Sequence, residues 1–124
     1  MNGEDEMGAY HEFFMRGDLA PQEVANELEH ATGVEFTPTG NFGGVQYRAN
    51  IDSAVVEIEF GHEFENDMGI DFENFPIQVT VRDLERNRSR ELATANRIFD
   101  RIDSSKLQAQ LVYDGQVLIA KNYM

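Results

Sequence analysis

The chain lacks cysteine, tryptophan and any long apolar segment. Without cysteine there is no disulfide, no thiolate nucleophile and no cysteine-ligated metal. No stretch approaches the roughly 20 apolar residues that span a bilayer. The opening residues, MNGEDEMGAY, carry acids where a signal peptide carries a basic end. These absences predict a soluble, cytoplasmic protein.

Positive charge is scarce as well. Ten lysines and arginines stand against 23 acids, which gives a formal net charge of −13 at pH 7. Such an excess argues against a nucleic acid or an anionic membrane as the partner, and it favours a basic protein. A need for solubility or adaptation to high salt would also account for the acidic composition.

The charge is unevenly distributed along the sequence. Residues 49–81 contain eight acids and no lysine or arginine, whereas residues 82–101 contain six of the ten cations. The folded molecule should therefore have one acidic region and one of mixed charge. An oriented field of this kind steers association with a charged partner.

The length of 124 residues predicts a single domain, residues 1–124, of which residues 1–8 are expected to be flexible. Apolar residues at helical spacing predict one helix capped by Asp18 and ended by Gly33, and a second helix over residues 87–103. The buried stripe of the second helix is expected to consist of Leu92, Ala95, Phe99 and Ile102.

One hairpin can be predicted together with its register. If Asp52 and Ser53 form a two-residue turn, apolar residues pair on one face of the two strands and polar residues pair on the other. The predicted pairs are Val45–Phe60, Tyr47–Ile58, Ala49–Val56, Gln46–Glu59 and Arg48–Glu57. In the C-terminal segment LQAQLVYDGQVLIA, the Asp114-Gly115 turn predicts the pairs Leu111–Leu118 and Ala109–Ala120.

Strands over residues 10–15, 34–38 and 75–81 complete an element order of β-α-β-β-β-β-α-β-β. Successive hairpins favour a mostly antiparallel sheet, and two amphipathic helices can cover one of its faces. The predicted fold is therefore α+β with both helices packed on one face. The other face is either solvated or used for association.

No motif specifies a reaction, so the chain is not expected to be an enzyme. There is no phosphate-binding G-x-x-x-x-G-K-[ST] loop, and no serine lies in an activating context. His11, His30 and His62 are far apart, and ENDMGIDFEN has Met68 and Ile70 where a calcium loop has oxygen ligands. We therefore expect no metal and no cofactor, with a cation held by His62 and the neighbouring carboxylates left as an open alternative.

The segment FGHEFENDMGIDFEN, residues 60–74, is the most unusual part of the chain. Fourteen residues separate the strand that ends at Phe60 from the one that starts at Phe75, whereas hairpin loops are about 2 to 5 residues long. Its apolar residues either fold back onto the domain or form anchors ringed by carboxylates, which is the composition of a surface that binds a basic protein.

The segment FPIQVTVRDLERNRSRELATANRIFDRI and the strands after it, which make up about the C-terminal half of this chain, resemble small acidic bacterial proteins of the toxin-immunity type. This resemblance implies a non-enzymatic inhibitor that covers a toxin, by presenting carboxylates where a basic nuclease would bind phosphates. The partner-binding residues would then be Glu57, Glu59, Glu63, Phe64, Glu65, Asp67, Asp71 and Phe72.

Two alternatives stay open. Small size, acidity and an α/β sandwich also suit a secretion-chaperone-like or adaptor protein, which would form a homodimer through Val112, Val117 and Ile119. A metal-dependent or paired-carboxylate hydrolase is the third hypothesis, because with 23 acids some pair of carboxyl groups is always available.

Overall fold

The computed structural model describes residues 10–124, so the segment expected to be flexible, residues 1–8, lies outside the described residues. The elements follow the predicted order. They are β1 (His11–Arg16), α1 (Pro21–Thr32), β2 (Thr37–Phe42), β3 (Val45–Ile51), β4 (Ala54–Phe60), β5 (Ile77–Asp83), α2 (Arg88–Phe99), β6 (Gln108–Tyr113) and β7 (Val117–Lys121).

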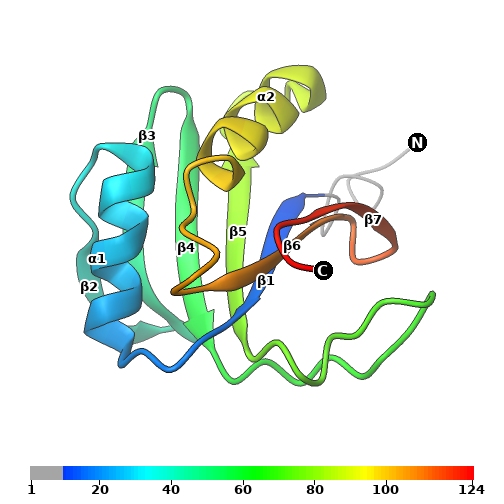
Figure 1. The fold of residues 1–124 in the computed structure, drawn as a ribbon. Helices are drawn as coiled ribbons and strands as arrows, with labels where there is room; N and C mark the ends of the chain where they lie inside the picture. Colours follow the sequence, from blue (N-terminus) through cyan, green and yellow to red (C-terminus); the bar gives the residue numbers. More distant parts are fainter. Residues whose placement is uncertain (1–9) are drawn as a thin grey trace.

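The strands form one antiparallel sheet in the order β2-β3-β4-β5-β1-β6-β7. The first strand of the chain is therefore an interior strand, held between β5 and β6. Both helices lie on the same side of this sheet (Figure 1). The predicted α+β architecture, with two helices on one face, is confirmed.

The main core lies between the helices and the sheet. Alternation along β1 directs Phe13 and Met15 toward the helices, where they are fully buried against Leu28 of α1 and Ile98 of α2. The stripe predicted for α2 is only partly correct. Ala95 and Phe99 are buried, but Glu91 and Ile98 occupy the face where Leu92 was expected.

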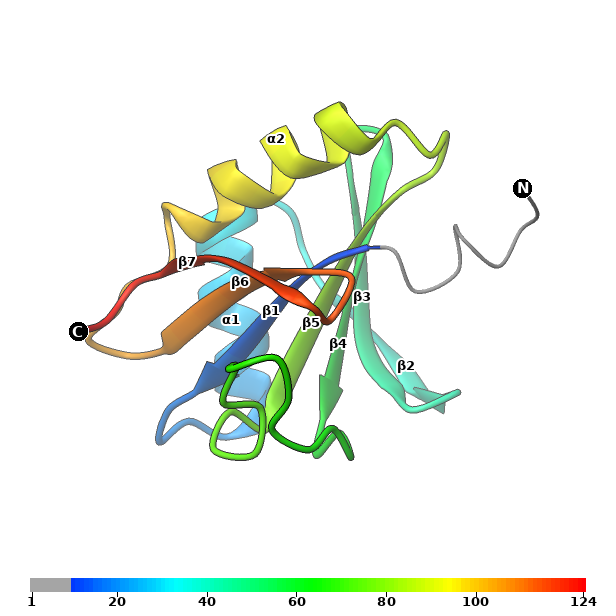
Figure 2. The same cartoon turned by 90° about the vertical axis from the view of Figure 1, so that its right-hand side faces the viewer.

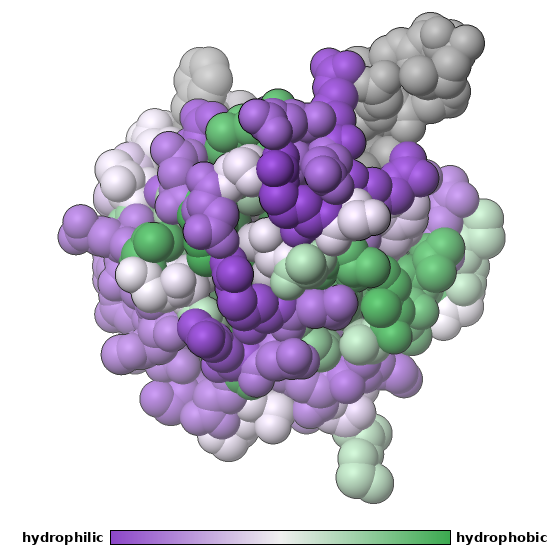
Figure 3. Space-filling view, turned by 90° about the horizontal axis from the view of Figure 1, so that it is seen from above, coloured by the Kyte–Doolittle hydropathy of each residue, from purple (hydrophilic) through white to green (hydrophobic). Residues whose placement is uncertain are grey.

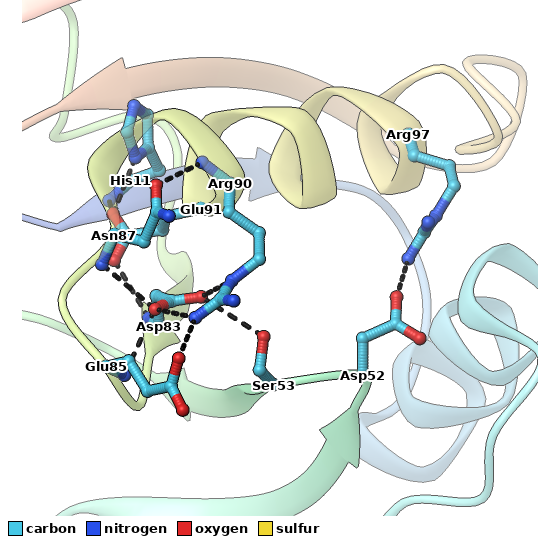
Figure 4. Close-up of polar contacts among 9 residues, drawn as sticks. All are labelled: His11, Asp52, Ser53, Asp83, Glu85, Asn87, Arg90, Glu91 and Arg97. Carbon is cyan, nitrogen blue, oxygen red and sulfur yellow. Dashed lines mark hydrogen bonds and ion pairs between the residues drawn. The ribbon is translucent and has the colours of Figure 1, made fainter.

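The carboxylate of Glu91 explains this rotation, because it joins α2 to two strands (Figure 4). Its Oε1 accepts the backbone N–H of His11 at 3.0 Å and lies 2.6 Å from Nδ1 of the same residue, and its Oε2 accepts the backbone N–H of Asp83 at 2.9 Å. Both His11 and Glu91 are buried, so each satisfies the other's polar atoms.

A second polar group fixes the start of α2. The side chain of Arg90 donates to both carboxylate oxygens of Asp83 at 2.8 and 2.9 Å, and the backbone N–H groups of Glu85 and Asn87 also donate to Asp83 (Figure 4). The hydrogen bonds from Arg90 hold the pKa of Asp83 well below its usual range.

Several predicted boundaries differ from the structure, and α2 ends at Phe99 instead of residue 103. The cap of α1 is Ala20 and not Asp18, because Pro21 occupies the first helical position and Glu23 Oε1 accepts the backbone N–H of Ala20 at 2.7 Å. The strand expected over residues 34–38 begins only at Thr37, since the preceding residues leave α1 through Gly33, whose φ of 79° is left-handed.

The register of the β3–β4 hairpin is confirmed for most of its length. Tyr47 pairs with Ile58, Arg48 with Glu57 and Ala49 with Val56, across a turn in which Asp52 has a φ of 54°. Near the open end, an irregularity between Val45 and Tyr47 places Val45 opposite Glu59. The predicted pairs Val45–Phe60 and Gln46–Glu59 are therefore wrong.

The register of the β6–β7 hairpin was predicted wrongly. Leu111 pairs with Ala120, and Val112 with Leu118, because three residues form the turn and the register shifts between Leu111 and Val112. Alternation along β6 puts Val112 on the face of the sheet opposite the helices, which we call the outer face, and the shift brings Leu118 beside it. Val112 is completely buried there and cannot join Val117 and Ile119 in the predicted dimer seam.

The loop between β4 and β5, residues 61–76, covers part of the outer face. It packs in front of the sheet, on the side away from α1 (Figure 2). The loop and the outer face form a second cluster of buried apolar residues, separate from the main core. Its buried members are Phe14, Ile70, Phe72, Phe75 and Val112. The expectation that the loop's apolar residues fold back on the domain is thus met for Ile70 and Phe72 but not for Phe64 and Met68, which are exposed.

Candidate functional site

A pocket of about 690 Å³ lies on the outer face, between the loop and the β6–β7 turn. Such a volume is within the range of ligand sites, roughly 300–1,000 Å³. One wall is formed by residues 63–68 and Phe72, the other by residues 114–116, and Glu12 lines the pocket from the sheet. Among these described lining residues there are five carboxylates and no lysine or arginine.

Glu12 reaches this pocket because alternation along β1 points it away from the helices. It lies between Thr80 of β5 and Val112 of β6 and is only 8% exposed. Its Oε2 accepts a hydrogen bond from Nε2 of Gln78 at 2.7 Å. Within residues 10–124 no donor bonds to its other oxygen, Oε1, which is not among the buried atoms without a partner and is therefore open to the pocket.

The surroundings of Glu12 oppose its negative charge. Burial raises the pKa of Glu12 to about 7, the negative charges of Asp114, Glu59 and Glu91 add to this increase, and only the hydrogen bond from Gln78 acts against it. A carboxyl group with a strongly displaced pKa in a pocket is characteristic of functional sites. A cation that entered the pocket would relieve the repulsion and could bond to the open Oε1 of Glu12.

The wall formed by the loop combines aromatic rings that contact one another with exposed carboxylates. Phe64 is 47% exposed and makes an edge contact with Phe14 at 5.6 Å and a tilted contact with Phe72 at 5.8 Å between ring centroids. Glu63, Glu65 and Asp67 are exposed, as is Met68. A ligand with an apolar stem and a positive end would match this combination.

Internal hydrogen bonds hold the loop in this shape. Asn66 Oδ1 accepts the backbone N–H groups of Phe72 and Glu73 at 2.8 and 2.9 Å, and the backbone groups of Asp67 and Ile70 pair with each other. Between them Met68 and Gly69 have φ angles of 51° and 75°, so the tip is a tight turn. These hydrogen bonds give the long acidic segment a defined shape.

His62 anchors the base of the loop. Its Nε2 lies 2.7 Å from the backbone oxygen of Phe75 and its Nδ1 accepts the backbone N–H of Phe64 at 3.0 Å. Both ring nitrogens are therefore used within the loop, which leaves neither for the cation considered above. Across residues 10–124, no group of three or more histidine, aspartate or glutamate side chains could hold a metal ion.

The structure brings five of the predicted partner-binding residues together. Glu63, Phe64, Glu65, Asp67 and Phe72 all line the pocket, although Phe72 is 3% exposed and acts mainly as part of the second cluster rather than as an exposed anchor.

The other three predicted residues lie outside the pocket. Glu57 forms ion pairs with Arg48 at 3.7 Å and Arg82 at 3.4 Å. Asp71 accepts hydrogen bonds from Asn74. Glu59 is on the outer face, where burial and the neighbouring Glu57 raise its pKa. Of the three, only Glu59 contributes to the field at Glu12.

Two carboxylates of the pocket were not predicted from the sequence, Glu12 and Asp114. The signal for Glu12 was a single carboxylate within HEFFMR, the most aromatic strand of the chain. A charged residue in such a strand must face either solvent or a special site, and only the position of β1 inside the sheet shows which. Asp114 was assigned to the turn alone.

Seen from the side of α2, hydrophobic residues form only limited patches (Figure 3). Neither helix in the described part of the chain is long and apolar enough to cross a membrane. No protein-family model, curated protein or solved structure shows significant similarity to this chain, so its site is interpreted from geometry and chemistry alone.

Proposed function

We propose that this chain is a non-enzymatic protein-binding domain that covers a basic partner, in the manner of an immunity-type inhibitor of a toxin. The observation that supports the proposal best is the outer-face pocket. Five carboxylates line it, and none of them forms an ion pair with another residue of the described chain. Unpaired charge of one sign around an apolar centre suits a partner of the opposite sign.

The pocket has the layout of a protein-binding surface. Phe64 and Met68 provide exposed apolar area, and Glu63, Glu65 and Asp67 surround it. Apolar anchors that are shielded by a polar rim supply most of the affinity in protein interfaces, while the rim charges mainly increase the association rate. Among the described lining residues there is no histidine, serine, threonine or lysine, so the pocket offers few groups for catalysis other than carboxyls.

A variant that removes the rim charges tests the proposal. We suggest the triple substitution Glu63→Gln, Glu65→Gln and Asp67→Asn. The side chains of Glu63 and Glu65 have no hydrogen bond within residues 10–124, and an amide at position 67 would keep the oxygen that accepts the Met68 N–H. Asp71 stays, since it holds Asn74. The partner would be isolated from the native cells by cross-linking and then purified for association kinetics.

The matched control removes three acids elsewhere. Asp18→Asn, Glu35→Gln and Asp100→Asn change the net charge equally, at exposed positions outside the pocket. At low salt we expect the pocket variant to associate with the basic partner about tenfold more slowly or worse, while the control keeps most of the rate. Equal rates for the two variants, or a captured partner that is acidic, would contradict the proposal.

The second candidate function is that of a chaperone-like or adaptor protein that acts as a homodimer, and one observation favours it. β7 is an edge strand, and its Val117 and Ile119 are 54% and 41% exposed. An apolar edge strand can pair with a second copy. Val117→Asp tests this, because a chaperone-like dimer would dissociate to the monomer mass in solution, whereas a protein that is already monomeric at micromolar concentration excludes it.

A further inference from the structure

We propose that the pocket beside Glu12 is a subsite for one basic side chain, lysine or arginine, of the partner protein, and that Glu12 is the carboxylate with which this side chain pairs. The inference rests on the proposed function and names the chemistry of its central contact. It gives Glu12 a role that the exposed acids of the loop do not share.

The first argument is the unpartnered oxygen of Glu12. Glu12 is more than nine-tenths buried, and its Oε2 is bonded to Gln78. No residue from 10 to 124 bonds to Oε1, and this oxygen is not among the buried side-chain atoms without a partner, so it is accessible from the pocket. Since Glu12 also lines the pocket, a donor that enters can reach it.

The second argument is the shape and composition of the pocket. Phe64, Phe72 and Met68 provide an apolar wall along which the methylene groups of a lysine or arginine can pack, and the exposed ring of Phe64 can accept a cation against its face. The rim acids Glu63 and Glu65 attract the cation before it reaches Glu12. A neutral or anionic side chain could pack on the apolar wall but would gain no attraction from the acids.

The third argument is the charge that faces Glu12 from each neighbouring element. Asp114 approaches from the β6–β7 turn and Glu59 from β4, and the acids at positions 63, 65 and 67 belong to the loop, while Glu91 of α2 acts from the opposite face of the sheet. All of these groups are acidic. A bound cation would therefore favour the ionised form of Glu12, and binding at pH 6 would release a proton from it.

A single-residue probe tests the subsite directly. N-acetyl-arginine methylamide carries one guanidinium and no other charge, and the citrulline analogue has nearly the same shape without the charge. Binding of each is followed through the side-chain amide resonances of Gln78, which contacts Glu12. We expect the arginine probe to shift these resonances in a saturable manner and the citrulline probe to leave them in place.

The variant Glu12→Gln identifies the pairing group. An amide at this position removes the charge and keeps an oxygen for Gln78, so the fold should persist. At pH 8 we expect Glu12→Gln to weaken binding of the arginine probe about tenfold or more, as loss of a charge-assisted hydrogen bond does, and Glu35→Gln to have no such effect. Unchanged binding by Glu12→Gln, or equal binding of the citrulline probe, overturns the proposal.

The pH dependence provides a second readout. With a pKa of about 7 in the empty pocket, Glu12 should bind the arginine probe about tenfold more tightly at pH 8 than at pH 6. Calorimetry in two buffers of different ionisation enthalpy should detect the released proton at pH 6. Glu12→Gln should abolish both effects, which separates Glu12 from the other acids around the pocket; retention of either effect overturns the assignment.

The outcomes also distinguish this inference from the proposed function. If the triple loop variant loses the partner but Glu12→Gln binds both probe and partner normally, the docking surface stands and the subsite is wrong. If the arginine probe binds through Glu12 but the loop variant associates with the partner like its matched control, the subsite stands and the docking surface is wrong.

Discussion

The substitution Glu12→Gln should stabilise the protein at alkaline pH. The pKa of Glu12 is about 7 in the folded protein and 4.5 without its surroundings. Because folding raises this pKa, the stabilising contribution of Glu12 is fully present below pH 4.5 and is lost as the pH rises toward 7. Ionisation of the buried Glu12 therefore lowers the free energy of unfolding, whereas the neutral amide of Glu12→Gln has no such effect.

The magnitude follows from the two pKa values. Each pH unit between 4.5 and about 7 changes the free energy of unfolding by about 1.4 kcal/mol, so the full cost above pH 7 is about 3 kcal/mol. The sequence pI of 4.4 makes measurements near pH 4.5 impractical, because a protein near its pI tends to precipitate. Between about pH 5.5 and pH 8.5 the accessible part of the change is about 2 kcal/mol.

Urea denaturation at several pH values across this interval measures the effect. The free energy of unfolding of Glu12→Gln minus that of the unsubstituted protein should increase by about 2 kcal/mol from the acidic to the alkaline end and level off above pH 7. The control Glu35→Gln removes the same charge from an exposed site and reports the general relief of repulsion. A difference that is flat with pH, or that matches this control, would refute the reasoning about Glu12.

Three further predictions concern stability. Gly17→Ala should destabilise the protein by about 1–3 kcal/mol in urea denaturation, because the new Cβ would lie 2.4 Å from the backbone oxygen of Lys106; unchanged stability would show that this segment adapts freely. Phe72→Ala should lower the free energy of unfolding by about 3–5 kcal/mol, and Phe64→Ala by about 1 kcal/mol, because Phe72 is buried and Phe64 is half-exposed. Equal losses of stability would place both rings in the core. Arg90→Gln should destabilise the protein most at neutral pH, because it removes the ion-pair partner of Asp83. The loss of stability should shrink as the pH falls below 3.8, where Asp83 without this partner becomes protonated. A loss of stability independent of pH would mean that Arg90 acts through packing.

Several features could be predicted because they depend on neighbours close in sequence. The pairs Tyr47–Ile58 and Ala49–Val56 followed from alternation around a two-residue turn, and the structure confirms them. The order of elements and the α+β class followed from the same periodicities. Local pattern also indicated that residues 61–74 would be an unusual loop, although it could not distinguish its buried from its exposed aromatics.

The predictions that were wrong concerned features that depend on contacts between distant segments of the chain. Leu92 was placed in the core of α2 on apolar character, but three hydrogen bonds from β1 and β5 hold Glu91 there instead. Val112 was assigned to an exposed face, whereas a register shift in the β6–β7 hairpin and the returning loop bury it. Side-chain polarity alone does not reveal which partner a distant strand will supply.

The sequence by itself determined the acidic character of this protein, its single antiparallel sheet with two helices, and the segment that carries its exposed carboxylates. Only the tertiary structure decided that Glu12 belongs with them. Its place depends on β1 lying between β5 and β6, and on the loop and the β6–β7 turn closing around one pocket. Burial is a property of the whole fold, and burial is what turns one carboxyl among 23 acids into a distinct chemical group.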